Sequence, residues 1–286
     1  MGKFSQSVRK ELCASVADKD KAFACLYAMF IFSRRGDELR FTVNSVQAAE
    51  LFASLTDTVF RGKVTPLLTD EKSFEITDAK QTGLVRDKFP FLKENAEFSF
   101  SRIGRIRQDA FFAGIFLACA GISDPQKEYH LEFFTPTAAL CAELYAELNS
   151  RGIVAKARES GSVYIKDSES IEDTLALMGA GMSALNVMNA KIHKDIANRA
   201  NRAANCDTAN IDRTLAAARR QLEAIERLRQ AGAFESLSAP LRELAELRIN
   251  NPESSLTELG ELLSPPIGRA GVNRRMQKLE KAAAEL

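Results

Sequence analysis

The chain has 286 residues, of which 45% are hydrophobic and 27% are charged, and its formal net charge is +1. These values are typical of a globular protein with a sizeable core and room for two domains. Because the net charge is close to zero, it does not by itself indicate a nucleic-acid partner. The longest apolar stretches, residues 22–32 and 110–122, are too short to span a bilayer, so no membrane partner is expected.

Side chains suited to a metal or redox site are scarce. The five cysteines lie far apart, and His130 and His193 are the only histidines, so no zinc site is expected. The N-terminal residues are charged and amphipathic, unlike a signal peptide. We therefore expect a cytoplasmic protein with reduced thiols and with no metal or other cofactor.

The first two thirds of the chain contain one pattern of elements twice. Each copy opens with an apolar block, and alternating side chains in the segments that follow predict strands. In the first copy the pattern predicts helices at 21–32, 45–60 and 79–88 and strands at 39–43, 63–67 and 73–77. In the second copy it predicts helices at 109–120, 136–150 and 171–179 and strands at 129–134, 154–158 and 162–166.

The two copies also match residue by residue. Small residues in the opening helices, Ala28 in one and Ala113 and Gly114 in the other, predict close packing of this pair at the centre of a pseudo-twofold domain with saddle-shaped sheets. The simpler alternative is that both apolar helices are buried in a hydrophobic core without any duplication. The matched pairs are Phe74 with Val163, Ile76 with Ile165, Asp78 with Asp167, and Arg61-Gly62 with Arg151-Gly152.

Such a repeated unit resembles the LAGLIDADG homing endonucleases, in which an acidic residue at the end of each repeated helix holds a metal that cuts DNA. The matching positions here are Ser33 and Cys119, and neither is a carboxylate. Asp37 and Asp124 follow the two helices in predicted loops, where carboxylates favour turns. The resemblance therefore implies the fold without its catalytic metal, and no enzyme activity.

Residues 189–230 form a polar, alanine-rich segment that is expected to be a helical connector. Between residues 191 and 230 there are nine Lys or Arg and five Asp or Glu. Asparagine is unfavourable inside helices, so the repeated asparagines of NRANRAANCDTAN are unusual. They either cap and turn the chain or form a polar surface for DNA or the neighbouring domain. The residues expected to make such contacts are Arg199, Arg202, Asn205 and Asn210.

Three helices are predicted after the break at Gly232. The first begins at Pro240, and the second opens with a capping box of Ser255 and Glu258. The third covers about residues 269–284. Between residues 264 and 281 there are five basic residues and one acidic residue, so positive charge is concentrated on the third helix, as a recognition helix requires.

Early residues of a recognition helix reach the base edges in the major groove. Because arginine can bind guanine and asparagine can bind adenine, we expect Arg269, Asn273 and Arg274 to contact bases. Arg275 and Lys278 are expected to contact phosphates. The alternative is a solvated basic helix end. The full set of expected DNA contacts is Ser255, Thr257, Ser264, Arg269, Ala270, Gly271, Asn273, Arg274, Arg275 and Lys278.

Segments along the whole chain resemble the WhiA family of bacterial transcription regulators. They are FSQSVRKELC near the N-terminus, SVYIKDSESIEDTLALMGA, the asparagine run and the C-terminal helices. The resemblance implies a LAGLIDADG-type domain without nuclease residues, a helix-turn-helix, and a role in sporulation, cell division and chromosome segregation. WhiA proteins commonly enter the third helix with Ser-Lys-Ser-Gly and have a histidine before the second-turn arginine. This chain has Gly268-Arg269-Ala270-Gly271 and Arg274, so its DNA target need not be that of the family.

The expected fold class is α+β, with a duplicated LAGLIDADG-like αββαββα domain followed by an all-α helix-turn-helix domain. The first domain is expected in residues 1–195, with repeats at about 20–90 and 108–180. A helical connector is expected in residues 196–236, and the helix-turn-helix domain in residues 237–286.

The expected function is a non-cutting, sequence-specific DNA-binding regulator in the nucleoid. Double-stranded DNA is the expected partner, other transcription factors and RNA polymerase are further candidates, and no small-molecule substrate is expected. The alternatives are a residual metal-dependent nuclease and a protein-binding scaffold with incidental DNA affinity. Further DNA or interdomain contacts are expected from Arg102, Arg105 and Arg107.

Overall fold

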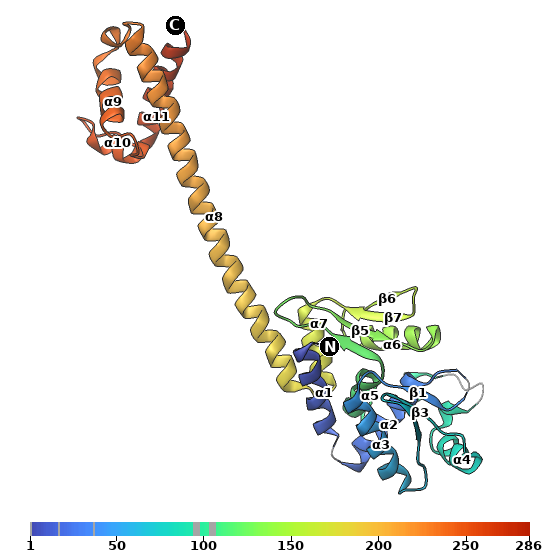
Figure 1. Cartoon of the computed structure of the whole chain (residues 1–286). Coiled ribbons are helices and arrows are strands. Elements are labelled where there is room, and N and C mark those ends of the chain that lie inside the picture. Colours follow the sequence, from blue (N-terminus) through green and yellow to red (C-terminus); the bar gives the residue numbers. More distant parts are fainter. Residues whose placement is uncertain (1, 17, 37, 94–97, 103–106) are drawn as a thin grey trace. The chain divides into compact units, whose positions relative to one another are not determined.

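The computed structural model describes residues 2–16, 18–36, 38–93, 98–102 and 107–286. The chain divides into two compact units, Met1–Asp195 and Ile196–Leu286 (Figure 1). The first unit is a mixed α+β domain and the second is entirely helical in the part that the structure describes, which confirms the predicted fold class.

The first unit contains two copies of a helix–strand–helix–strand–strand–helix pattern, and the second copy has one additional strand directly after its first helix. Helix α1 (Lys3–Ser15) precedes the first copy, and two short 3₁₀ helices, Pro90–Leu92 and Phe100–Arg102, lie between the copies. The first copy consists of α2 (Lys19–Ser33), β1 (Arg40–Thr42), α3 (Val46–Phe60), β2 (Leu67–Asp70), β3 (Ser73–Glu75) and α4 (Ala79–Lys88). The second consists of α5 (Gln108–Cys119), β4 (Ala120–Ile122), β5 (Leu131–Phe134), α6 (Ala138–Ser150), β6 (Lys156–Arg158), β7 (Ser162–Ile165) and α7 (Ser168–Leu177).

The two antiparallel sheets repeat the same strand order. The first sheet has the order β1–β3–β2, and the second has β4–β5–β7–β6, so β5, β7 and β6 correspond to β1, β3 and β2. Strand β4 pairs Ala120 with Phe133 directly after α5. At the matching place after α2 there is a single bridge between Arg34 and Phe41. The sheets therefore align Ser33 with Cys119, each one residue before the first paired residue.

The strand predicted at residues 63–67 is displaced. Strand β2 begins at Leu67 and runs to Asp70, with an irregularity between Leu68 and Asp70. Pro66 has no N–H group to donate to a sheet, so pairing starts after it. Strand β4 was not predicted as a separate element, because its residues continue the apolar run of α5.

Equivalent aspartates start the last helix of each copy. The side chain of Asp78 accepts from the N–H of Gln81, and that of Asp167 accepts from the N–H of Ser170. Aspartate at this position satisfies one of the free N–H groups of a helix start. The match between Asp78 and Asp167 in the sequence therefore reflects the same capping role, and α7 starts at Ser168 rather than at the predicted residue 171.

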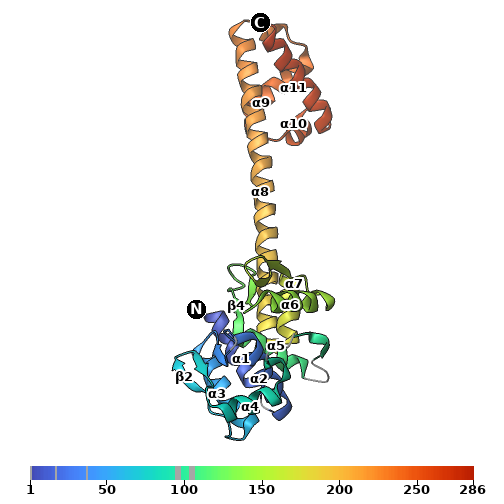
Figure 2. The same ribbon diagram turned by 90° about the vertical axis from the view of Figure 1, so that its right-hand side faces the viewer.

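Helix α1 is tied to distant parts of the first unit by two charged side chains. The guanidinium of Arg9 is buried, donates from Nη2 to the carbonyl oxygen of Ala120 at 2.9 Å, and lies over the ring of Phe116. The carboxylate of Glu11 accepts from the N–H groups of Met182 at 2.7 Å and Ser183 at 2.9 Å. Glu11 therefore caps the start of α8 (Gly181–Gln230) from another helix. Figures 1 and 2 show α1, α2 and α3 side by side.

The outward face of the second sheet carries a polar cluster around Glu132 on β5. This carboxylate is 7% exposed and accepts from the hydroxyl of Ser162 at 2.7 Å. His130 Nε2 lies 2.9 Å from it, and Arg158 Nη1 lies 3.0 Å from it. Burial alone would raise the pKa of Glu132, but the hydrogen bonds from Ser162 and His130 and the charge of Arg158 outweigh burial and lower it.

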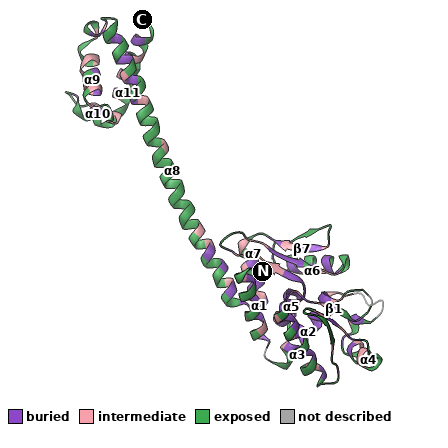
Figure 3. Ribbon diagram, viewed as in Figure 1, coloured by how far each residue is buried: buried purple, intermediate pink, exposed green. Residues whose placement is uncertain are grey.

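The second unit is built on the later part of α8. Its three further helices are α9 (Ala239–Asn250), α10 (Leu256–Leu262) and α11 (Arg269–Ala284), after a short 3₁₀ helix at Phe234–Ser236. Ile225 and Leu228 of α8 pack into the same core as Leu244, Leu259 and Met276. Residues 198–208 of α8 are all exposed (Figure 3). Among the described residues, no helix has the length and apolar character needed to cross a membrane.

Candidate nucleic-acid interface

Helix α10 is positioned by the capping box that the sequence predicts. The N–H of Glu258 donates to Ser255 Oγ at 3.3 Å, and the N–H of Ser255 donates to the Glu258 carboxylate at 2.7 Å. Each side chain therefore satisfies a backbone group of the other, which defines where the helix begins. Ser255 is thereby used as a cap, whereas Thr257, also expected to contact DNA, is exposed.

A glycine permits the close approach of α10 to the entry of α11. A β-carbon on Gly260 would lie 2.2 Å from the carbonyl oxygen of Ile267 and 3.1 Å from Val272 Cγ2. The N–H of Ile267 donates to the carbonyl oxygen of Gly260 at 3.0 Å. Because only a residue without a β-carbon fits here, Gly260 sets the distance between α10 and α11.

Sequence reasoning missed a buried arginine in the turn before α10. Arg248 is 1% exposed and donates from Nη1 to the carbonyl oxygens of Ser254 at 2.6 Å and Asn251 at 3.4 Å. Desolvation by burial lowers its pKa. The arginine thus holds the turn that leads to Ser255. Arg248 occupies an unremarkable position in a predicted polar-apolar helix, so no local pattern distinguished it.

Helix α11 has one buried and one exposed face. Val272, Met276, Leu279 and Ala283 are buried, as the apolar pattern predicts. At about 100° of rotation per residue, Arg274 and Lys278 lie together on the opposite side, and the exposed Asn273 lies on the flank between that side and the buried face. The expected DNA contacts that are exposed on or just before α11 are Ser264, Arg269, Ala270, Asn273, Arg274 and Lys278.

Two expected contacts of α11 are not fully exposed. Arg275 is half-buried at the border of the buried face. Gly271 is also half-buried and packs against the side chain of Ile267, 3.2 Å from the position of an added β-carbon. Within the described chain, the one ion pair of α11 joins Lys281 to Glu285 at 3.8 Å. Arg269, Arg274, Arg275 and Lys278 consequently carry no carboxylate partner among the described residues, which leaves their charge available to a phosphate or base.

The asparagine run lies inside α8. Arg199, Arg202, Asn205 and Asn210 are all exposed, and the helix continues through them. The alternative that the asparagines cap or turn the chain is therefore wrong. Asn210 accepts from Arg213 Nη1 at 3.0 Å, and Thr214 donates to the Asn210 carbonyl oxygen at 2.9 Å, so its contacts remain within the helix.

Of the arginines expected to contact DNA from the first unit, Arg107 has a described side chain. Arg105 and the side chain of Arg102 lie outside the described residues. Arg107 donates from Nη2 to Asp109 at 2.8 Å and lies 3.9 Å from Asp18. The hydrogen bond that Arg107 donates to Asp109, together with the charges of these carboxylates, raises the pKa of Arg107. Arg107 is therefore held in a surface ion pair.

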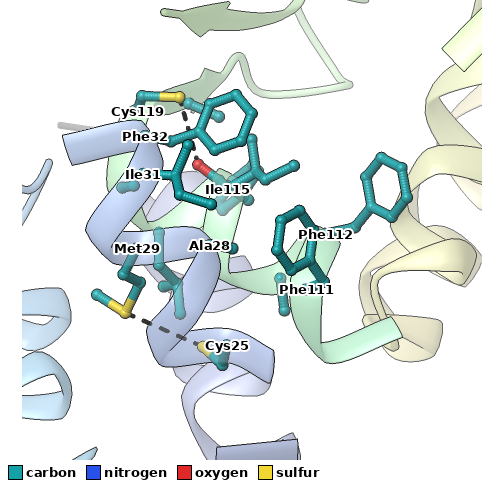
Figure 4. Packing of buried hydrophobic residues seen from close by; sticks show 14 of the residues in the cluster. Cys25, Ala28, Met29, Ile31, Phe32, Phe111, Phe112, Ile115 and Cys119 are labelled. Carbon is teal, nitrogen blue, oxygen red and sulfur yellow. Dashed lines mark hydrogen bonds between the residues drawn. The ribbon is translucent and has the colours of Figure 1, made fainter. Parts of the chain in front are cut away.

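The positions that hold metal in the endonucleases are closed in this chain. Ser33 Oγ donates to the Met29 carbonyl oxygen at 2.6 Å. Cys119 Sγ donates to the Ile115 carbonyl oxygen at 3.4 Å (Figure 4). Both side chains are buried, and burial raises the pKa of the Cys119 thiol to about 12. The hydroxyl and the thiol are thus bonded back into their own helices, and neither supplies the anionic oxygen that magnesium prefers.

The carboxylates that could replace those ligands offer no metal site in the described chain. Asp37 lies outside the described residues. Asp124 accepts from the N–H of Gln126 at 3.0 Å in a turn, which is an ordinary role for a loop aspartate. Among the described residues, no group of three or more His, Cys, Asp or Glu side chains is arranged to hold a metal ion.

Two family models match successive parts of the chain. The WhiA LAGLIDADG-like domain matches residues 108–197, and the WhiA C-terminal HTH domain matches residues 200–283. The second match begins within α8, so it includes all but the first two residues of the asparagine run, as well as α9, α10 and nearly all of α11.

Curated relatives and a solved structure agree with these matches. The probable cell division protein WhiA of Clostridium botulinum (strain Hall) is 32% identical over 310 aligned positions, which cover 99% of this chain and 98% of that protein. The protein of the same name from Clostridium perfringens (strain SM101) is 43% identical over 183 residues, but the match spans only 63% of this chain and 58% of that protein. Full-length DUF199/WhiA from Thermotoga maritima shares the fold, with a TM-score of 0.53 at 21% identity, over 100% of this chain and 99% of that one. The chain belongs to the WhiA family.

Proposed function

We propose that the chain is a sequence-specific DNA-binding regulator of cell division that does not cut DNA. The exposed face of α11 carries this proposal, because it presents Asn273, Arg274 and Lys278 while the opposite face packs in the core. In a helix-turn-helix, such a face enters the major groove, where side chains of these types bind base edges and phosphates.

The charge distribution supports the same function. Residues 237–286 contain seven basic and seven acidic residues and are neutral overall, whereas the five basic residues between 264 and 281 accompany one acidic residue. A positive helix within a segment that is neutral overall attracts phosphates without making the rest of the segment bind them nonspecifically. Arg199 and Arg202 are exposed on α8 and add further positive charge to the second unit.

The first unit serves in this proposal as a non-catalytic scaffold that adds DNA or protein contacts. Ser33 and Cys119 support the loss of cleavage, because both are buried and bonded to helix carbonyl oxygens. The relatives are called probable cell division proteins, which supports a role in that process. The proposal has finer parts, which are roles in chromosome segregation and sporulation control, localisation to the nucleoid, and contacts with other transcription factors or RNA polymerase.

The proposal is tested by incubating the purified full-length chain with fragmented genomic DNA and Mg²⁺, then sequencing the retained fragments and their ends. Intact fragments enriched in a common sequence are expected. New, defined ends would contradict the loss of cleavage. Retention without enrichment would contradict sequence-specific binding and would favour the protein-binding scaffold.

A further inference from the structure

A cavity of about 660 Å³ lies in the first unit where its two copies meet. One wall is the end of α2, another is formed by Phe91, Leu92 and Phe98 between the copies, and a third is the start of α6. This volume falls within the range of small-molecule sites, roughly 300–1,000 Å³. The lining residues that the argument uses are Ile31, Arg35, Phe91, Phe98, Leu140 and Glu143.

Most of the cavity wall is apolar or aromatic. Ile31 and Leu140 are buried, and Phe91 and Phe98 are half-buried with their ring centroids 5.5 Å apart in an edge-to-face arrangement. Aromatic rings beside aliphatic side chains can bind the flat or aliphatic apolar part of a small molecule. Such binding is favourable because it removes apolar surface of both the protein and the ligand from water.

The charged groups of the cavity favour an anion. Arg35 lines it as an exposed cation, whereas Arg34, which also lines it, already has an interaction of its own. Glu143 is the one acidic residue in its described lining. The Glu143 carboxylate accepts from the N–H of Phe100 at 3.2 Å, so one of its oxygens is engaged. Arg35 is exposed, and its guanidinium forms no hydrogen bond or ion pair with any residue in the described parts of the chain.

The first turn of α6 also attracts an anion, but more weakly than Arg35. Thr137 and Ala139 line the cavity at the start of this helix, where unpaired N–H groups give a partial positive charge. Thr137 Oγ1 already accepts from the N–H of Leu140 at 3.2 Å.

We propose that this cavity binds a small amphipathic anion, with a flat or aliphatic apolar body between Phe91 and Leu140 and its acidic group at Arg35. This inference does not rest on the exposed face of α11, because every residue in it belongs to the first unit. A nucleotide and a medium-chain carboxylate share this chemistry, and they are separated by the competition experiment below.

The test uses 1-anilinonaphthalene-8-sulfonate, an aromatic anion that becomes fluorescent in apolar surroundings, with the full-length chain. Saturable binding is expected, and Ala142→Trp should weaken it at least tenfold, because Ala142 lines the cavity and is exposed on α6. Ala146→Trp is the matched control, because Ala146 is exposed one turn further along α6 and lies outside the lining. Arg35→Gln should weaken binding several-fold and reduce its dependence on salt.

The same titration identifies the class of anion. Displacement of the dye by octanoate but not by AMP would indicate an acyl chain, and the reverse would indicate a nucleotide. Equal dye binding by wild type and Ala142→Trp, with thermal unfolding unchanged, would overturn the proposal. So would a loss of equal size in Ala146→Trp, or dye binding that never saturates.

Discussion

Gly114 of α5 lies directly against the carbonyl oxygen of Cys25 in α2. A β-carbon on Gly114 would stand 2.3 Å from that oxygen and 2.8 Å from the Ala28 β-carbon. Because a helix carbonyl cannot swing aside like a flexible side chain, the two helices are this close only with glycine at residue 114. The contact joins the opening helices of the two copies.

Gly114→Ala is therefore expected to destabilise the protein by at least about 1–3 kcal/mol, the usual cost of overpacking a core. Urea unfolding followed by circular dichroism measures this loss. Gly83→Ala is the control, because Gly83 is inside α4 and a β-carbon there would contact nothing within 4 Å. It should stabilise by up to about 1 kcal/mol. Equal stabilities of the two variants would contradict the packing of α2 against α5.

Gly260→Ala should disrupt the junction of α10 and α11, because its β-carbon would lie 2.2 Å from the Ile267 carbonyl oxygen. We expect a loss of at least about 1–3 kcal/mol in thermal unfolding and weaker DNA binding. Gly271→Ala provides the comparison. Its β-carbon would meet the flexible end of the Ile267 side chain at 3.2 Å, so its stability should remain within about 1 kcal/mol of wild type. A tolerated Gly260→Ala would show that this junction is not tightly packed.

The exposed face of α11 predicts two different effects on DNA binding. Arg274→Ala should weaken binding to the enriched sequence by about 1–3 kcal/mol and relax the preference at one base pair. Lys278→Ala should weaken binding to all sequences alike and reduce the salt-dependence slope by about 1. Titrations with selected and scrambled duplexes at several salt concentrations separate the two. Unchanged affinity and preference in Arg274→Ala would remove that residue from base recognition.

Glu11→Ala should destabilise the first unit, because the carboxylate accepts from the N–H groups of Met182 and Ser183 and from the Ser183 hydroxyl. The expected loss is about 0.5–2 kcal/mol, as for other lost helix caps. Lys10→Ala changes an exposed neighbour on α1 and should have little effect. Hydrogen exchange at the start of α8 provides a local readout, and unchanged protection there would contradict the cap.

Glu132→Gln should alter the dependence of stability on pH. The folded pKa of Glu132 is lowered, so its ionised form stabilises the fold above the ordinary glutamate value of about 4.3. This contribution is lost as the pH falls through the lower, folded pKa. The stability difference between wild type and Glu132→Gln should therefore be constant at neutral pH and shrink in acid. Urea unfolding across this range checks it, with Glu159→Gln, an exposed residue in the β6–β7 turn, as the control.

Much of the fold could be predicted because its signals are local. Helix 79–88 was predicted at its observed bounds, and the capping box of Ser255 and Glu258 marks the start of α10 by its spacing alone. The strand predicted at residues 63–67 was displaced to Leu67–Asp70, because pairing with β3 decides where a strand starts. Periodicity within one segment carries no information on that partner.

The amino-acid sequence by itself determined the repeated helices, their small residues and the absence of carboxylates at Ser33 and Cys119. Only the tertiary structure decided which distant groups meet. Arg9 reaches the carbonyl oxygen of Ala120, 111 residues away, and Glu11 caps Met182, 171 residues away. Caps and amphipathic faces depend on neighbours within a few residues, and so they appear in the sequence. Contacts such as those of Arg9 and Glu11 form only after folding brings separate segments together. Any buried carbonyl oxygen could have accepted from Arg9, and the free N–H groups of any helix start could have donated to Glu11, so the sequence does not single out the partners.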